Sequence, residues 1–580
     1  MKCAKRWIGL LLSLAMVLPL AACGGEPEVS APGPAEPDPA EQTEPRYGGE
    51  LVLYFQEFTS NFDPSIDDRR QYALWFEPLF AMDWSREDAA EVFVSDYMTM
   101  EWMTGQLAED YQYENGDLTV YLRTDVCFQD KEPYNGRPLV SGDVKWTYDR
   151  LLGIGSGYDK PYASENDWSA ALPMVESIEC PDEHTVVFHF NTDSEVALNT
   201  FITTQVCIGG PEWDELTTEQ QNDWHYAAGT GPYILEDYSP DNYMTFVRNE
   251  NYYDHDERYP DNRLPYLDRI KLQFISDSTQ LQTQFIAGNI DVMSWGNNLL
   301  NKTEIELLED TMNAGDYVKY VYDSGAYSIA LKQTIEPFRD IRVRQAMQLA
   351  IPVQEIHEQY FGYTADTISL CGMFSPNTQF SSVDQWSQEL YDSYHTYDPE
   401  RAKELLAEAG YPDGFSFDFI MSPSADADLF ALVSNYLAQV GIQMNITVAS
   451  SSVESAQVAH DPNTTSCYLS MAGATRFKLL FNSFRSGQSG NTIHADDPYI
   501  DEMLDRFNTV QTLAEQEAVA KEVDEYFAEQ HYVAFVEGAD LVYSFVSDRV
   551  GGYAGERLWK NWNTSQILAR IWVIDGTQAG

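Results

Sequence analysis

Two histidines in the segment HTVVFH are the first side chains whose type suits metal chemistry. His184 and His189 each carry an imidazole, which is the commonest metal-binding side chain in proteins. They are five residues apart, and side chains alternate between the two faces of a strand. If the segment is a strand, the two rings point to opposite faces, so we do not expect this pair to chelate a metal.

Four consecutive residues, Asp254-His255-Asp256-Glu257, form an acidic cluster that could in principle hold Ca²⁺. The carboxylates do not have the spacing of an EF-hand loop. The chain contains 92 acidic residues, so acidic clusters arise without any special role. We interpret this cluster as a solvated loop and predict no metal site.

Motifs for catalysis are missing from the sequence. It contains no HExxH, GxxxxGK[ST] or GxSxG, and no GxGxxG that opens a helix after a strand. Pairs of carboxylates are abundant, but a pair indicates glycosidase chemistry only when its geometry is known. We therefore predict no catalytic residues and no cofactor, with an exported enzyme as the alternative.

The seven cysteines show no CxxC spacing, so a thiolate metal site is not indicated. Cys3 and Cys23 lie in the N-terminal segment. The five others form an odd set, so at least one lies outside any intramolecular pair, and the sequence does not assign the pairing. They are Cys127, Cys180, Cys207, Cys371 and Cys467.

Residues 1–22 have the pattern of an export signal, with a basic start, an apolar stretch from Ile8 to Leu20, and small residues at the end. The apolar stretch is too short and wrongly flanked for a membrane span. The ending Leu20-Ala21-Ala22-Cys23 resembles the bacterial lipobox, which implies that Cys23 is acylated and becomes the mature N-terminus. The alternative is an ordinary signal peptide with a chance cysteine.

Residues 23–46 are rich in Pro, Glu and Ala and have almost no apolar bulk. Such a segment cannot bury enough surface to fold, so we predict an extended tether. The formal net charge of the whole chain is −57. This charge argues against nucleic acid as a partner, and against unaided adhesion to an anionic membrane.

Strands and helices alternate along the rest of the chain, which predicts an α/β fold. The segment from Gly229 to Val292 illustrates the pattern. Its GTGP start is turn chemistry, with glycines able to adopt positive φ. Strands are predicted at 243–248 and 267–275. Asp277 can cap a following helix that ends at Gly288.

Three other segments give local predictions. Asn115-Gly116 is a strong hairpin signal, and Ser141 precedes an amphipathic helix. Asp340 can cap a helix with Val343 and Met347 inward and with Arg342 and Arg344 outward, where ion pairing is expected. We predict strand from Val533 to Val546.

Four ordered segments carry a resemblance to a known family. The chain resembles the extracytoplasmic solute-binding proteins of the peptide/nickel ABC transporter family (family 5), which include oligopeptide- and dipeptide-binding lipoproteins. Pro352 replaces the acidic residue usual in that family, and 134–137 is an insertion. The segments are LAEDYQYENGDLTVYLR at 107–123, GTGPY to LPYLDRI at 229–270, PFRDIRVRQA at 337–346, and YDPERAKELLAEAGYPDGF at 397–415.

The resemblance implies a two-lobed, periplasmic-binding-protein-like (type II) α/β fold with three domains and a hinged cleft between the lobes. Domain I would be discontinuous, since the chain leaves it and returns twice. The implied boundaries are 47–75, 206–300 and 538–580 for domain I, 76–205 for domain II, and 301–537 for domain III.

The function implied is that of a binding lipoprotein of an ABC importer, monomeric and lipid-anchored on the extracytoplasmic face of the cell membrane. It would capture a peptide or peptide-like solute and deliver it to the permease. The alternatives are a non-peptide solute (a sugar, an anionic metabolite or a metal chelate), or an exported enzyme or sensor on the same scaffold.

The ligand-binding residues are less well indicated. Peptide-binding members carry a segment resembling GWxADYPDP, whose acid holds the α-ammonium group of the peptide. Ala472 stands here in place of the tryptophan and Thr475 in place of the acid. An enclosed ammonium group needs a nearby anion, so another acid supplies it or the ligand is not a free-amino peptide. Arg476 would favour an anionic group if it faces the cleft, and a surface position is the alternative.

Aromatic side chains commonly form the walls of such clefts. We expect Trp295 to be a ligand contact, followed by Tyr327 and Phe58. Core packing is the alternative for each of the three.

Overall fold

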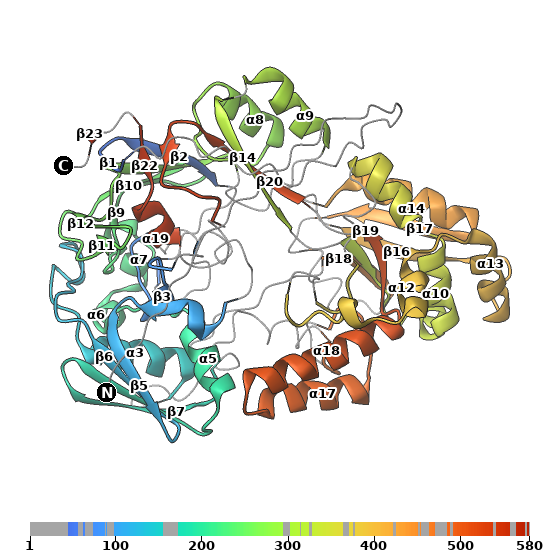
Figure 1. The fold of residues 1–580 in the computed structure, drawn as a ribbon, viewed down its shortest axis with the longest axis horizontal. Coiled ribbons are helices and arrows are strands. Elements are labelled where there is room, and N and C mark those ends of the chain that lie inside the picture. The colour runs from blue at the N-terminus through green and yellow to red at the C-terminus, as the bar shows by residue number, and fades with distance from the viewer. Residues whose placement is uncertain are drawn as a thin grey trace, which may run out of the picture. The chain divides into compact units, whose positions relative to one another are not determined.

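The computed structural model describes residues 44–55, 62–63, 74–86, 89, 98–154, 172–293, 302–313, 315–323, 327–362, 370–374, 378–421, 425–449, 453, 463–469, 484–487, 491–537, 541–556, 564–574 and 577–578. All of them belong to one compact unit, Glu41–Gly580. Three main sheets organise this unit (Figure 1).

The first sheet has four strands in the order β2-β13-β10-β9. Its strands are β2 (Glu50–Phe55), β13 (Arg269–Phe274), β10 (Tyr243–Arg248) and β9 (Tyr233–Ser239). β2 runs parallel to β13, and the other pairs are antiparallel. Ile270 and Leu272 alternate with partly exposed neighbours and are fully buried, as their spacing predicts.

A single residue extends this sheet toward two further strands. Val292 forms a parallel bridge to Leu53 and an antiparallel bridge to Val546. Val546 lies in β20 (Leu541–Ser547), which pairs over its whole length with β14 (Tyr317–Asp323). The β14–β20 pair is therefore connected to the first sheet through Val292.

The second sheet is antiparallel, in the order β5-β6-β8-β7. Its strands are β5 (Ala108–Glu114), β6 (Asp117–Leu122), β8 (Thr185–Phe190) and β7 (Val175–Asp182). The predicted hairpin joins β5 to β6, with φ of 54° at Asn115 and 86° at Gly116. Two helices, α3 (Ser141–Leu152) and α5 (Glu195–Thr203), pack on this sheet's core. Ser141 begins α3 rather than preceding it.

The third sheet mixes parallel and antiparallel pairs in the order β17-β16-β18-β15-β19. Its strands are β17 (Ile442–Val448), β16 (Phe415–Met421), β18 (Thr464–Leu469), β15 (Tyr327–Ala330) and β19 (Val533–Glu537). Helices surround it (Figure 1). They are α10 (Ile341–Leu349), α12 (Gln388–His395), α13 (Pro399–Glu408), α14 (Ala427–Gln439), α17 (Pro498–Thr509) and α18 (Leu513–Glu529).

Two of the local predictions in this region were wrong. The predicted strand Val533–Val546 consists of β19 and β20, which belong to different sheets. Arg344 on α10 is buried, whereas Arg342 is partly exposed and pairs with Asp340 as expected. The Arg344 guanidinium donates to the carbonyl oxygens of Gln530 and Phe338, so it points inward to backbone acceptors and not outward as predicted.

The remaining elements are short. The strands are β1 (Arg46–Tyr47), β3 (Phe80–Met82), β4 (Met103–Gly105), β11 (His255–Asp256), β12 (Tyr259–Arg263), β21 (Val550–Gly551), β22 (Trp572–Val573) and β23 (Thr577–Gln578). The α-helices are α6 (Glu212–Glu215), α7 (Thr218–Gln221), α8 (Ser278–Ile286), α9 (Lys302–Thr311), α11 (Val353–Glu355) and α19 (Thr564–Ala569). The 3₁₀ segments are η1 (Met100–Trp102), η2 (Trp224–Tyr226), η3 (Glu336–Arg339) and η6 (Val383–Gln385), and η4 (Ile356–Phe361) is π-helical.

Each sheet has its own hydrophobic core. The first sheet shares its core with α8, α9 and α19, and the second sheet packs against α3 and α5. The third sheet has one core with α10, α13 and α14, and a further core lies beneath α17 and α18. The predicted domain boundaries stay a prediction.

The two ends of the described chain meet. β1 pairs antiparallel with β23, so that Arg46 is opposite Gln578, and the Arg46 guanidinium donates to the carbonyl oxygen of Ile574. Across the described ranges, we find no helix with the length and apolar character that crossing a bilayer requires.

Close packing, not positive φ, explains the glycines of the GTGP turn. Neither Gly229 nor Gly231 has a positive φ. A Cβ on Gly229 would overlap the carbonyl oxygen of Trp75, and a Cβ on Gly231 would lie 2.9 Å from the carbonyl oxygen of Leu74. The turn therefore needs glycine because it lies directly against the backbone at 74–75.

We predict that Gly229→Ala destabilises the protein by about 2 kcal/mol, because overpacking at a rigid backbone contact forces that backbone to move. The measurement is the free energy of unfolding in urea. Gly142→Ala is the matched control, since a Cβ there meets only Val140 Cγ2, at 4.0 Å. Equal stability of the two variants would contradict the close approach.

Candidate functional site

Tyr327 is the only predicted ligand residue whose side chain the structure describes, and it lies in the core of the third sheet. Its exposed fraction is 4%, and its ring meets Phe430 edge-on with a centroid distance of 6.0 Å. Its placement matches the core-packing alternative. The other predicted site residues lie outside the described part of the chain: Cys23, Phe58, Trp295, Thr475 and Arg476.

Four of the cysteines predicted to lack an assignable pairing can be placed. Cys127 and Cys180 carry free thiols, with Cys127 exposed and Cys180 half-buried. Cys207 lies in the core of the first sheet, and Cys371 lies in the core of the third sheet.

Two neighbouring passages of the chain connect the first and third sheets. On one side Asp323 of β14 is opposite Leu541 of β20. On the other side Tyr327 of β15 is opposite Glu537 of β19. In each passage, three residues separate the β14–β20 ladder from the β15–β19 ladder. This is the arrangement expected of a paired connection between two bodies that move relative to each other.

A buried carboxylate fixes the start of this connection to the first sheet. Asp291 is 2% exposed, and its Oδ2 accepts from the backbone N–H of Val52 at 2.7 Å. Its Oδ1 accepts from Arg549 at 2.9 Å, and its carbonyl oxygen accepts from the N–H of Ser547 at 2.8 Å. The end of β20 is thereby held to β2.

The histidine pair does not form a site. His184 lies in the turn between β7 and β8, and His189 Nδ1 contacts Asp117 Oδ1 at 2.7 Å. Among the described residues, no group of three or more His, Cys, Asp or Glu side chains is placed to hold a metal ion.

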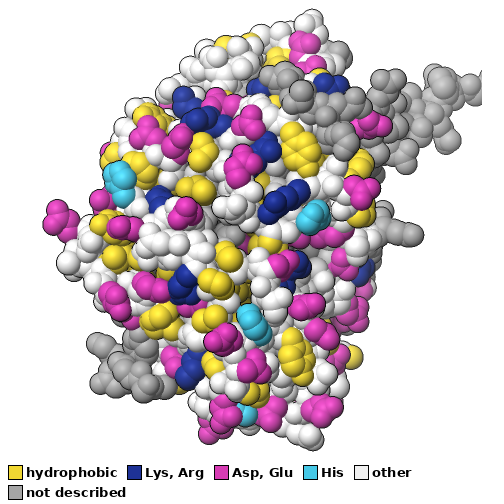
Figure 2. All heavy atoms as spheres, turned by 90° about the vertical axis from the view of Figure 1, so that its left-hand side faces the viewer, with side chains coloured by type: hydrophobic (Ala, Val, Ile, Leu, Met, Phe, Trp, Pro, Cys, Tyr) yellow, Lys and Arg dark blue, Asp and Glu magenta, His cyan; other side chains and the backbone are white. Residues whose placement is uncertain are grey.

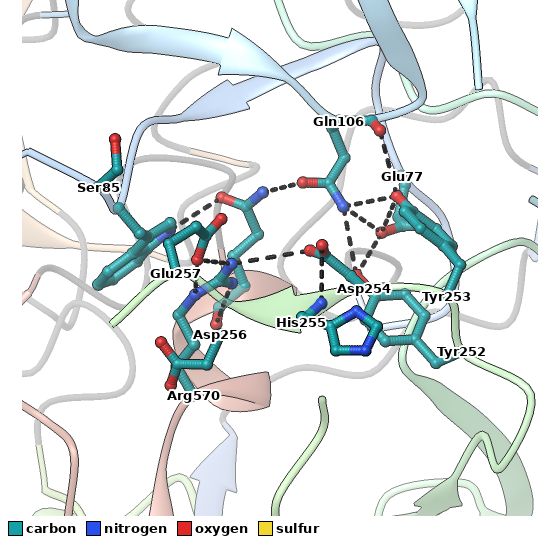
Figure 3. A network of polar contacts seen from close by, with 12 residues as sticks. Glu77, Ser85, Gln106, Tyr252, Tyr253, Asp254, His255, Asp256, Glu257 and Arg570 are labelled. Carbon is teal, nitrogen blue, oxygen red and sulfur yellow. Dashed lines mark hydrogen bonds and ion pairs between the residues drawn. The ribbon is translucent and has the colours of Figure 1, made fainter. Parts of the chain in front are cut away.

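The acidic cluster 254–257 is solvated only in part: His255 and Glu257 are exposed, as predicted for a solvated loop, whereas Asp256 is buried (Figure 3). Arg570 is 1% exposed and donates to Glu257 Oε2 at 2.6 Å, with Asp254 at 3.7 Å. Asp256 is fully buried and pairs with Arg258 at 2.9 Å. The acids thus hold arginines from the C-terminal helix region and from their own loop.

A second buried group, shown in Figure 3, converges on Glu77. Its Oε1 accepts from Gln106 Nε2 at 2.7 Å, from the Tyr252 hydroxyl at 2.7 Å and from the Tyr253 hydroxyl at 3.3 Å. Gln106 accepts in turn from Gln566 of α19. The network links the residues before β3, the start of β5, the loop before β11, and the C-terminal helix.

Burial raises the pKa of Glu77 from 4.5 to about 7, although the hydrogen bond from Tyr252 favours the charged form. The Thr230 hydroxyl and Gln106 also act to lower the pKa, but burial outweighs them. This carboxyl therefore takes up a proton near neutral pH, which an exposed glutamate does not do.

The sequence contains a signal for this buried acid that our reading missed. Glu77 lies within the run Trp75-Phe76-Glu77-Pro78-Leu79-Phe80, and all the remaining residues of this run are apolar. An acid in such a run is either exposed at a turn or buried with partners. The partners Gln106, Tyr252 and Gln566 are far away in the sequence and carry no local signal.

The described site residues form a scaffold of buried polar contacts. Figure 2 shows one face of the molecule, where acidic side chains are spread over the whole surface with Lys and Arg side chains among them. No single area of that face gathers basic side chains. The buried hydrogen bonds and ion pairs described above hold loops in place.

A protein-family model matches residues 103–489 of this chain, and its description is "Bacterial extracellular solute-binding proteins, family 5 Middle". Heme-binding protein A of Haemophilus influenzae is 26% identical over 359 residues, which cover 58% of this chain and 60% of that protein. Di/tripeptide-binding protein 1 of Pseudomonas aeruginosa is 25% identical over 352 residues, covering 58% and 61%. The chain thus spans about three fifths of the length of these two curated relatives.

Two solved structures share the fold over nearly their whole length. The periplasmic binding protein DppA from Helicobacter pylori, in complex with the peptide STSA, has a TM-score of 0.70 at 19% identity, covering 91% of this chain and 98% of that one. AgaA from A.tumefacien R10, in complex with agropinic acid, has a TM-score of 0.68 at 16% identity, covering 91% and 100%. The predicted two-lobed, periplasmic-binding-protein-like (type II) fold is confirmed.

We predict that the stability of the protein falls by about 3 kcal/mol between about pH 4.5 and pH 7 through Glu77 alone. In this window the unfolded chain has released the proton and the folded protein retains it, so folding becomes less favourable as the pH rises. Glu77→Gln has no such proton. The measurement is the difference in unfolding free energy between wild type and variant at pH 5 and at pH 7.5.

In the difference between wild type and variant, the contributions of all other titrating groups to the pH dependence cancel. One of these groups is Asp524, since burial raises the pKa of this residue to about 6. A difference that is the same at both pH values would show that Glu77 ionises as an exposed glutamate does.

Proposed function

The chain belongs to family 5 of the bacterial extracellular solute-binding proteins, and we propose that it is the substrate-binding component of an ABC importer. The observation that carries the proposal is the family match over residues 103–489, which contains the whole second sheet and most of the third. It acts as a monomer outside the membrane and delivers its solute to the permease subunits.

Binding needs enclosure of the solute, and the fold supplies the means. Solutes of such proteins lie between lobes that close by a hinge. The paired passages that leave β14 and β20 connect the first sheet with the third, and Asp291 holds one end of that pair firmly. Capture and release by this motion require no bond chemistry, which agrees with the missing catalytic motifs.

We propose a peptide or peptide-like solute. Two similar proteins support this proposal. One curated relative is named a di/tripeptide-binding protein, and one solved structure contains a bound tetrapeptide. Heme-binding protein A and the agropinic acid complex support the alternative of a non-peptide solute. Thr475, which stands in place of the acid that holds an ammonium group in the family, favours that alternative.

The proposed location is the extracytoplasmic face of the cell membrane. Cys23 would be acylated, and about 0.8 kcal/mol per buried CH₂ makes two or three acyl chains a durable anchor. Residues 24–46 would then be the tether that leads to β1 at Arg46. An anchor through lipid suits a chain with a net charge of −57, which an anionic membrane surface repels.

A thermal-shift screen tests the ligand class. We expect the dipeptide Met-Leu or the tetrapeptide Ser-Thr-Ser-Ala to raise the melting temperature of the mature protein, because a ligand that binds only the folded state stabilises it. Heme, agropinic acid and Fe(III)-EDTA are the comparison ligands.

Stabilisation by a comparison ligand alone would replace the peptide with a non-peptide solute. Steady formation of a product from any of these compounds would mean that the protein is an enzyme and would contradict the binding function.

The lipid anchor is tested by Cys23→Ala. We expect this variant to leave the membrane fraction for the soluble fraction, since the acylated thiol is lost, whereas wild type stays with the membrane. Cys3→Ala is the matched control, because it removes a thiol from the same leader without touching the lipobox. A Cys23→Ala protein that remained membrane-bound would rule out acylation at this residue.

A further inference from the structure

Helices α5 and α18 meet although one packs on the second sheet and the other on the third-sheet side of the chain (Figure 1). The backbone N–H of Glu195 in α5 donates to the carbonyl oxygen of Gln511 at 3.0 Å. Glu195 Oε2 accepts from the backbone N–H of Leu513 at 3.1 Å. The second of these hydrogen bonds joins residues that are 318 positions apart in the sequence.

The Glu195 carboxylate completes the capping of α18. Thr512 is the N-cap, and its side chain accepts from the N–H of Glu515, while the Glu515 carboxylate accepts from the N–H groups of Thr512 and Gln511. This capping box leaves the N–H of Leu513, the first residue of the helix, which Glu195 takes up. A carboxylate at a helix N-terminus is also favoured by the helix dipole.

Local contacts hold Glu195 in position. Ser194 caps α5 by accepting from the N–H of Ala197 at 3.0 Å. The N–H of Ser194 donates to the hydroxyl of Tyr113 in β5 at 3.1 Å. The start of α5 is thus attached to the second sheet, so the carboxylate is presented from a fixed backbone.

A ring contact lies beside these hydrogen bonds. Trp102 at the end of η1 packs against the hydrophobic core beneath α17 and α18. η1 is tied to α5, because Asn199 Oδ1 accepts from the N–H of Met100 at 2.8 Å. Glu195 and Trp102 therefore reach the same helical layer from the same side.

We propose that Glu195, Trp102, Gln511 and Leu513 form a clasp that holds the body of the second sheet against the α17–α18 layer. The chain itself connects the first sheet to the third only through the β14–β20 passages. The clasp is a second point of contact, made of two exposed hydrogen bonds and one ring. The Glu195–Leu513 hydrogen bond lies at the surface, and opening the clasp would also separate the Trp102 ring from the core beneath α17 and α18.

The clasp would influence how long a bound solute stays. Opening the clasp would free the two bodies to move about the paired passages. Its effect on solute release rests on the proposed binding function, whereas its effect on the contact between the bodies does not.

The test compares Glu195→Ala, Glu195→Gln and wild type. Alanine removes the acceptor of the Leu513 N–H, and glutamine keeps an acceptor oxygen but loses the charge. We expect hydrogen exchange at residues 511–515 to be fastest for alanine and intermediate for glutamine. The radius of gyration from small-angle X-ray scattering of the ligand-free protein should rise in the same order.

We expect release of bound Met-Leu or Ser-Thr-Ser-Ala to be about fivefold faster for alanine and about twofold faster for glutamine, the size of effect typical of a charge at a helix end. Glu176→Ala is the matched control, because it removes an exposed carboxylate from β7 of the same sheet.

Unchanged exchange and unchanged scattering in both Glu195 variants would overturn the clasp, whether or not the peptides bind. Binding of neither peptide to any variant would count against the proposed peptide function, and the exchange and scattering data would still decide the clasp. An equal change in Glu176→Ala would assign the effect to net charge and also overturn it.

Discussion

The pairing of β14 with β20 is the interaction on which the arrangement of the sheets depends. It brings together two segments more than two hundred positions apart, next to the points where the chain passes between the first and third sheets. Val292 bridges β2 to β20, and Asp291 adds a buried carboxylate to the same junction. Without this pairing, the two passages would be independent linkers.

Features set by neighbouring residues could be predicted from the sequence, and features set by distant partners could not. Strand β10 and the capping of α8 by Asp277 followed from alternation and from a side chain three residues from its partner. Arg344 was misplaced, because the carbonyl groups that bury it come from other elements. For Tyr327, a tyrosine in a strand suits a core and a cleft equally well, so spacing alone could not choose between them. The ion pair between the acidic cluster and Arg570 could not be predicted for a related reason, since Arg570 is 313 positions from Glu257.

The small number of cations makes their placement informative. The chain has 35 Lys and Arg residues and 92 acidic residues, yet several of its arginines form contacts inside the protein. Arg150 is 3% exposed and binds both oxygens of Asp63 at 2.8 and 2.7 Å, and Arg570 is buried against Glu257. Buried charges need partners of this kind, because an unpaired one is costly to desolvate. Each of these arginines is paired with an acid, so such a pair adds no net charge to the protein.

The meeting of β1 with β23 has a topological consequence. Because Arg46 is opposite Gln578, the folded body begins and ends at one place on its surface, and its backbone comes close to a closed ring. Few residues would be needed to join those ends, and new ones could be opened at an exposed turn such as Asn115-Gly116. A circular permutant of this kind would keep all three sheets while moving the chain ends to the second sheet.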